Sequence, residues 1–126
     1  MRAIQSIKDL EIPTRYQTYI LKYLENISDI PYVSRVILFG SCAKGTVTKY
    51  SDIDLFVTVN REISLDEEFL ISSDRLPDLG DYLSTDILVQ SEDTFNRFTD
   101  TTCAIQKQVN YYGVDLSEFI PKRPRN

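Results

Sequence analysis

Histidine is absent from this sequence of 126 residues, and its two cysteines, Cys42 and Cys103, have no Cys or His neighbour at metal-ligand spacing. The missing histidine removes the commonest general base and the commonest metal ligand, so Ser-His-Asp hydrolysis and zinc hydrolysis are excluded. Two cysteines are also too few for a disulfide framework. Any chemistry must therefore use carboxylates, hydroxyls, lysines or a hard metal ion.

Long apolar runs and a surplus of positive charge are also lacking. No apolar run approaches the roughly 20 residues needed to cross a bilayer. The N-terminal segment MRAIQSIKDLEIP has no apolar signal core, so we expect a cytoplasmic protein with no membrane partner. The 19 acidic and 14 basic residues give a formal charge of −5, which argues against direct nucleic-acid binding. The one basic cluster, in residues 121–126, is typical of a flexible tail.

The length and the order of the apolar segments predict a single α/β domain over residues 1–126. Runs of β-branched and apolar residues predict strands at 33–39, 53–59 and about 84–90. Helical spacing predicts helices at 14–28 and 93–110, with shorter helical segments within 4–10 and 61–80. The expected fold is a small mixed β-sheet flanked by helices.

The expected helix at 14–28 carries its apolar side chains on one face. Thr14 and Gln17 have the spacing of a capping box at its start. Tyr16, Tyr19 and Tyr23 fall on the apolar face. Three tyrosines in a row along a helix could form a ligand-binding stripe, but core packing is the favoured interpretation.

The turn that follows the first expected strand reads FGSCAKG. Gly40 would end the strand and Ser41 would open a short helix, so exposed backbone N–H groups and a hydroxyl could cradle phosphate oxygens. Gly40 would allow a ligand to approach the backbone closely, and Gly45 would allow a second tight bend. Taken alone, the same pattern is more often an ordinary turn with an N-cap residue.

Asp52 and Asp54 flank Ile53 at the start of the second expected strand. Side chains in a strand alternate between faces, so both carboxylates project from one side and repel each other unless a cation lies between them. Oxygen ligands suit Mg²⁺ or Mn²⁺, although the pair could also mark only the solvent-exposed mouth of a strand. Asp86 in the third expected strand is either paired, metal-bound or on a sheet edge exposed to water.

The spacing of these features is more specific than any one of them. Ten residues separate Ser41 from Asp52, and a Gly-Ser pair followed at this distance by Asp-x-Asp arises by chance about once in a thousand chains of this size. With Asp86 in the next strand, residues 33–90 resemble the nucleotidyltransferase superfamily of DNA polymerase beta. The resemblance is greatest to its minimal nucleotidyltransferase branch, the MntA-like antitoxins, and implies the nucleotidyltransferase fold.

The resemblance also implies roles for the three acids. Asp52, Asp54 and Asp86 would be catalytic and would carry two Mg²⁺ ions, with Mn²⁺ as a substitute. Asp86 would complete one metal site and orient or deprotonate the acceptor hydroxyl. Metal ions in such a site clamp the attacking and leaving oxygens of an in-line displacement at phosphorus, so no histidine base is needed.

For the nucleotide, the resemblance implies that Gly40 and Ser41 bind the triphosphate of ATP. Lys44 would neutralise charge on the β- or γ-phosphate, unless it is simply solvated. Family members often read GSRARG where this chain reads GSCAKG, so Cys42 and Lys44 each replace an arginine. The substitution leaves the metal ligands in place and bears on nucleotide affinity, and Cys42 is expected to be a small packing residue.

Minimal nucleotidyltransferases of this kind are typically antitoxins that transfer AMP from ATP to a tyrosine of a HEPN-type ribonuclease toxin. We therefore expect a protein adenylyltransferase with a small helical partner. Only 126 − 90 = 36 residues follow the third strand, so the acceptor is expected to be held by a partner chain, by a second copy in a homodimer, or not at all. The alternatives are a small-molecule, aminoglycoside-type nucleotidyltransferase and a non-catalytic antitoxin binding module.

Overall fold

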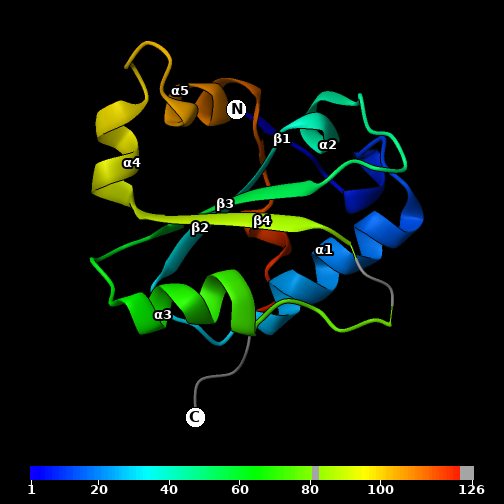
Figure 1. The fold of residues 1–126 in the computed structure, drawn as a ribbon, viewed down its shortest axis with the longest axis horizontal. Coiled ribbons are helices and arrows are strands. Elements are labelled where there is room, and N and C mark those ends of the chain that lie inside the picture. Colours follow the sequence, from blue (N-terminus) through cyan, green and yellow to red (C-terminus); the bar gives the residue numbers. More distant parts are fainter. Residues whose placement is uncertain (81–82, 123–126) are drawn as a thin grey trace.

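A five-stranded mixed sheet forms the centre of the protein in the computed structural model, which describes residues 1–80 and 83–122 (Figure 1). The strands are β1 (Arg2–Ala3), β2 (Val33–Phe39), β3 (Ile53–Val59), β4 (Thr85–Ser91) and β5 (Val114–Asp115), and their order in the sheet is β1-β5-β2-β3-β4. β4 is parallel to β3, β1 is parallel to β5, and β2 is antiparallel to both of its neighbours. The mixed sheet confirms the predicted fold class and makes β4 an edge strand.

Helices cover both faces of this sheet. They are α1 (Thr14–Asn26), α2 (Ser41–Lys44), α3 (Leu65–Phe69), α4 (Glu92–Phe98) and α5 (Ile105–Tyr112), with single turns η1 (Ile7–Asp9), η2 (Leu70–Asp74, a π-helical turn) and η3 (Ser117–Phe119). In Figure 1, α4 and α5 lie on one side of the sheet, and α1 and α3 lie on the other. In the described ranges, no helix combines the length and apolarity needed to span a bilayer.

The larger core lies between α1 and the sheet. Tyr16, Tyr19 and Tyr23 are all buried there, which confirms the interpretation of the tyrosine face as core. The Tyr23 hydroxyl donates to the Ile71 carbonyl at 2.8 Å, and burial raises the pKa of this tyrosine. A smaller core on the opposite face joins the strands to α4 and α5, where the Phe56 and Phe95 rings meet edge to face at 5.0 Å.

The start of α1 differs from the prediction. Pro13 occupies the N-cap position and no side chain caps the helix, so the capping box expected from Thr14 and Gln17 is wrong. The Gln17 side-chain amide instead donates to the Leu10 carbonyl at 3.1 Å. The chain turns into α1 through η1 and Pro13, and this turn places the Leu10 carbonyl within reach of Gln17. A capping rule considers only the residues at the helix start and so does not predict this hydrogen bond.

Other boundaries shift for local reasons. The helix predicted at 93–110 is two helices, because the chain turns through residues 99–104, where Cys103 has φ +67°. Phe98 and Ile105 flank this break and are exposed, so only part of the predicted apolar set is buried. Helical structure within 61–80 is limited to α3 and η2, and within 4–10 to η1. Of the tail expected at 121–126, residues 123–126 lie outside the described ranges.

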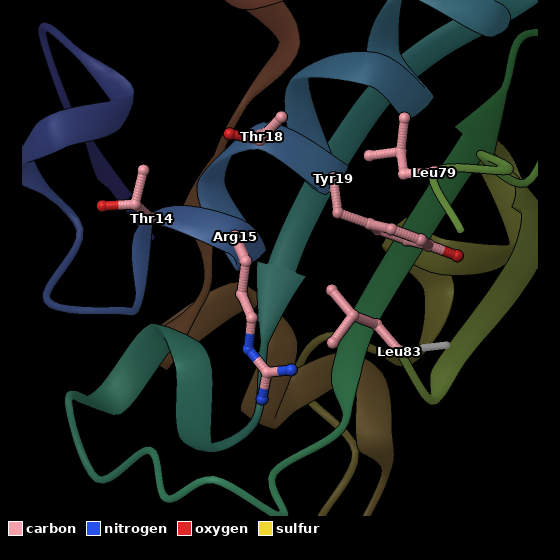
Figure 2. A pocket seen from close by; sticks show the side chains of 6 residues that line it. All are labelled: Thr14, Arg15, Thr18, Tyr19, Leu79 and Leu83. Carbon is pink, nitrogen blue, oxygen red and sulfur yellow. The ribbon is translucent and has the colours of Figure 1, made fainter. Parts of the chain in front are cut away.

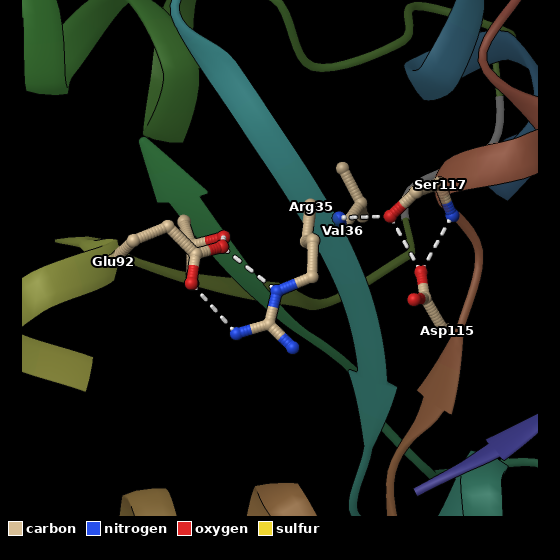
Figure 3. Close-up of polar contacts among 6 residues, drawn as sticks. Arg35, Val36, Glu92, Asp115 and Ser117 are labelled. Atoms are coloured by element: carbon tan, nitrogen blue, oxygen red, sulfur yellow. Dashed lines mark hydrogen bonds and ion pairs between the residues drawn. The ribbon is translucent and has the colours of Figure 1, made fainter. Parts of the chain in front are cut away.

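A partly buried ion pair joins β2 to α4 on the smaller-core face, as Figure 3 shows. Arg35 donates through Nε and a terminal nitrogen to the two Glu92 carboxylate oxygens at 2.7 and 2.8 Å. Thr58 of β3 also donates to Glu92, at 2.5 Å. Burial alone would raise the pKa of Glu92, but the hydrogen bonds from Arg35 and Thr58 outweigh it and lower the pKa below its usual value.

We predict that Glu92→Gln lowers the free energy of unfolding at pH 7 by about 1–3 kcal/mol, because it removes the charge from a hydrogen-bonded pair. A lowered folded-state pKa stabilises the fold above the usual glutamate value of 4.5, and this stabilisation is lost as pH falls through the folded-state pKa. Urea denaturation should therefore show that the difference in free energy of unfolding between wild type and Glu92→Gln becomes smaller as pH falls from 4.5 to the folded-state pKa. Asp93→Asn, in the same first turn of α4, is the control and should change stability by only a few tenths of a kcal/mol.

Candidate active site

One end of the sheet brings together the residues singled out in the sequence. Asp54 in β3 is the register partner of Phe39 at the end of β2 and of Asp86 in β4. Gly40 follows β2 directly, and Asp52 immediately precedes β3. β2 pairs antiparallel with β3, and β3 pairs parallel with β4. These pairings therefore place the glycine turn and the three acids at the same end of the sheet.

The register also decides which face of the sheet the acids occupy. Leu55 and Val57 of β3 belong to the α1-side core, whereas Phe56 belongs to the core beneath α4 and α5. Asp54 alternates with Leu55 and so lies on the α4/α5 face. Register partners in a parallel pair point to the same face, so Asp86 lies there as well. Asp52, two residues before Asp54, continues the same alternation.

The three carboxylates differ in exposure. Asp52 and Asp86 are exposed, and Asp54 is half-buried. Asp86 therefore lies at the start of an edge strand in contact with water, one of the alternatives that its sequence context left open. Burial raises the pKa of Asp54 above its usual value, and the negative charges of Asp86 and then Asp52 raise it further. The three acids thus lie close enough to repel one another.

This set of carboxylates fits a hard divalent cation by its donor chemistry. None of the ion pairs among the described residues involves Asp52, Asp54 or Asp86, so no basic side chain neutralises their charge. In residues 1–80 and 83–122, no three His, Cys, Asp or Glu side chains already converge on a single ion position. Binding of one cation by all three acids would therefore require a change of side-chain conformation, and Asp52 and Asp86 are both exposed.

Gly40 has no space for a side chain. Its backbone has φ +73° and ψ −155°, a conformation that favours glycine. A Cβ added at this position would collide with the Asp54 carboxylate, with Oδ2 too close and Cγ at 3.3 Å. Gly40 therefore lies in close contact with Asp54, the central acid of the site, and the predicted approach of a ligand to its backbone stays a prediction.

The turn after Gly40 forms the predicted short helix, α2. The Ala43 and Lys44 amides donate to the Gly40 carbonyl at 3.1 and 3.2 Å, and Gly45 ends the helix with φ +73°. Ser41 is half-buried at the first helical position, and no described residue hydrogen-bonds to its hydroxyl. That hydroxyl is free to bind a ligand, and its predicted contact with phosphate stays a prediction.

Cys42 connects this turn to the acid pair. Its Sγ donates to the Asp52 carbonyl at 3.4 Å, and the side chain is buried. Burial and the charges of Asp54 and Asp52 raise the pKa of the thiol to about 11. The thiol therefore stays protonated at neutral pH and acts as a packing residue rather than a nucleophile.

Lys44 points to an aromatic ring. Its ammonium Nζ lies 4.8 Å from the centroid of the Tyr112 ring at the end of α5, within the range of a cation–π contact. Nothing in the sequence predicts this pairing, because 68 residues separate the two positions (112 − 44). The predicted role of Lys44 at a β- or γ-phosphate stays a prediction, and Tyr112 is the neighbour that sequence analysis missed.

We predict that Gly40→Ala destabilises the protein by about 1–3 kcal/mol more than Gly80→Ala, measured by thermal and urea unfolding. Both glycines have positive φ, but an added Cβ at Gly80 meets nothing within 4 Å. The control therefore carries the backbone strain without the collision. A crystal structure of the Gly40 variant should show the Asp54 carboxylate displaced, and equal costs with an unmoved Asp54 would contradict this account of the site.

Comparison with known proteins agrees with this fold. The family model for the nucleotidyltransferase domain matches residues 20–126. A crystal structure of a candidate nucleotidyltransferase from Sulfolobus solfataricus has a TM-score of 0.53 and 23% sequence identity, covering 75% of this chain and 81% of that one. This likeness supports the fold alone, and none of the curated proteins matches the sequence. Because the family model matches most of the chain, the chain belongs to the nucleotidyltransferase domain family.

Proposed function

We propose that this chain is a Mg²⁺-dependent protein adenylyltransferase that transfers AMP from ATP to a tyrosine of a small helical HEPN-type toxin and thereby acts as its antitoxin. The observation that most supports nucleotidyl transfer is the strand register, which pairs Asp54 with Asp86 beside the Gly40 turn. Family membership supports a transferase. The choice of ATP, tyrosine and toxin follows from the resemblance of the GSCAKG and Asp-x-Asp segments to minimal nucleotidyltransferases.

In this proposal, the acids hold the metal and the turn holds the nucleotide. Asp52, Asp54 and Asp86 would bind the cations, and the Ser41 hydroxyl would bind the triphosphate. Bound divalent cations would lower the pKa of the acceptor hydroxyl and neutralise charge on the reacting phosphate. Mn²⁺, which accepts the same oxygen ligands, is expected to substitute for Mg²⁺.

The transfer itself is a displacement at the α-phosphorus. The acceptor oxygen forms a bond to that phosphorus, and the bridging oxygen to the β-phosphate leaves with its electron pair as pyrophosphate. The proton of the acceptor hydroxyl goes to Asp86 or to water. In this step the residues of the protein would orient the acceptor and stabilise the negative charge on the reacting phosphate.

We predict that Asp86→Asn raises the stability of the metal-free protein by up to about 1 kcal/mol, because it removes a like charge beside Asp54. The same substitution should abolish the rise in melting temperature that Mg²⁺ or Mn²⁺ gives the wild type, since a ligand that binds only the folded state stabilises it. Differential scanning calorimetry with and without each metal measures both effects. Asp93→Asn should change neither, and a metal-dependent rise that survives in Asp86→Asn would contradict the metal site.

We further predict that Asp52→Asn and Asp54→Asn each keep the fold and lower AMP transfer by at least about a hundredfold. The assay follows label from [α-³²P]ATP onto an acceptor protein, with circular dichroism as the check on folding. The acceptor to be assayed would be a small helical protein with an Arg-x4-His motif, sought in the gene next to the one that encodes this chain. Asp93→Asn is again the matched control, and transfer retained by either active-site variant would count against the mechanism.

Two further measurements separate this proposal from the alternatives. Label that passes to an aminoglycoside panel and not to the partner would identify a small-molecule nucleotidyltransferase. Toxin neutralisation in cells by the Asp54→Asn variant, equal to that by wild type, would identify a binding module that needs no catalysis. Label on a partner tyrosine, with neutralisation lost in the variant, is the result expected here.

A further inference from the structure

A cavity of about 440 Å³ lies beside the first two turns of α1 (Figure 2). Residues of α1 and of the segment before β4 line it, and they are Thr14, Arg15, Thr18, Tyr19, Leu79 and Leu83. In Figure 2 the Tyr19 ring extends toward the two leucines, and the Arg15 side chain lies apart from them. The volume is in the range of pockets that take small molecules or single side chains.

The cavity lies at the same end of the sheet as the acids. Leu83 precedes Ser84, whose carbonyl accepts a 2.9 Å hydrogen bond from the amide of Ile53, the residue between Asp52 and Asp54. From α1, the Tyr16 hydroxyl donates to the carbonyl of Ser51 at 2.8 Å. However, Tyr19 and Leu83 pack in the α1-side core, so the sheet separates the cavity from the face that bears the carboxylates.

The lining is mostly apolar, and two of its polar side chains, Tyr19 and Arg15, make no hydrogen bond or ion pair with any described residue. Tyr19 is only 4% exposed, and its hydroxyl has no hydrogen-bond partner among the described residues. No fully buried polar side-chain atom in those residues lacks a partner, so this hydroxyl must be open to the cavity that it lines. Arg15 makes no ion pair with any described residue, and its guanidinium carbon lies 5.2 Å from the centroid of the Tyr16 ring.

These groups define the chemistry of an occupant. Apolar walls favour an apolar group, the Tyr19 hydroxyl can donate and accept a hydrogen bond, and the exposed Arg15 side chain favours an anion beside it. A nucleotide held by the carboxylates would lie on the other face of the sheet. A protein lying across the sheet end could reach both the cavity and the acids.

We propose that this cavity anchors the acceptor protein, by receiving an apolar side chain of the acceptor that has an acidic residue next to it. The inference rests on the proposed function only in that the acceptor is a protein. The anchored side chain would hold the acceptor against the sheet end, and a hydroxyl elsewhere on the acceptor would face Asp54 and Asp86. The Arg15 guanidinium would pair with the adjacent carboxylate.

Two peptide probes test this without metal or nucleotide. N-acetyl-Phe-Glu amide and N-acetyl-Phe-Lys amide are titrated into the full chain and followed by NMR. The acidic peptide should shift the resonances of Thr18 and Leu83 and bind two- to fivefold more tightly than the basic one. Arg15→Glu should reverse this preference. A preference that Arg15→Glu does not reverse, or no shift of these resonances with either peptide, would overturn the proposal.

A filled cavity provides the matched control. Thr18→Trp places a large ring in the cavity and should abolish peptide binding, whereas Leu21→Trp adds the same ring to an exposed position of α1 outside the lining and should leave binding unchanged. In a last titration, ATP is added alone. Shifts of the Thr18 and Leu83 resonances on adding ATP would indicate a nucleotide subsite and overturn the proposal. This titration measures binding and not transfer, so its outcome does not depend on catalysis. A wild-type chain that binds the acidic peptide but transfers no AMP would contradict the proposed function and leave this inference intact.

Discussion

The contact between the Gly40 backbone and the Asp54 carboxylate is the constraint on which the site depends. It exists because β2 and β3 pair with Phe39 opposite Asp54, so the chain turns away from the sheet where the carboxylate stands. The β3–β4 register then adds Asp86 on the same face. A slip of one residue in β3 would turn its acids into the α1-side core and Ile53 out of it. Burial of the apolar residues of β3 therefore fixes the position of the carboxylates.

The carboxyl groups at the two ends of this sheet face have pKa values shifted in opposite directions. At the end of β3 and β4 that leads into α4, Glu92 has Arg35 and Thr58 as partners, and its pKa is lowered. At the other end, Asp54 lies beside two acids without a basic partner, and its pKa is raised. A raised carboxyl pKa means that the ionised form destabilises the fold at neutral pH. Such a local cost is typical of a site that binds a cation, and it supports the proposed assignment of the active site to this end of the sheet.

The sequence was sufficient to predict the parts of the fold that local patterns determine. Continuous apolar runs located β2, β3 and β4 to within one residue, and the Gly-Ser and Asp-x-Asp spacing singled out residues that the fold brings to one end of the sheet. β1 and β5 were missed because each has two residues, and their pairing is set by tertiary contacts. The meeting of Lys44 with Tyr112 could not be predicted either, since it depends on where α5 packs against the sheet.

The tyrosine face of α1 shows why core and ligand-binding interpretations of one pattern need not exclude each other. The hydroxyls of Tyr16 and Tyr23 donate to the carbonyls of Ser51 and Ile71, so each ring packs in the core and its polar atom is satisfied. Tyr19 is also buried in this core, but its hydroxyl opens into the cavity. Periodicity predicts that all three rings are buried, because it reports which way a side chain points. Whether a buried hydroxyl finds a partner depends on the segment opposite, and in α1 this separates a structural tyrosine from one able to bind a ligand.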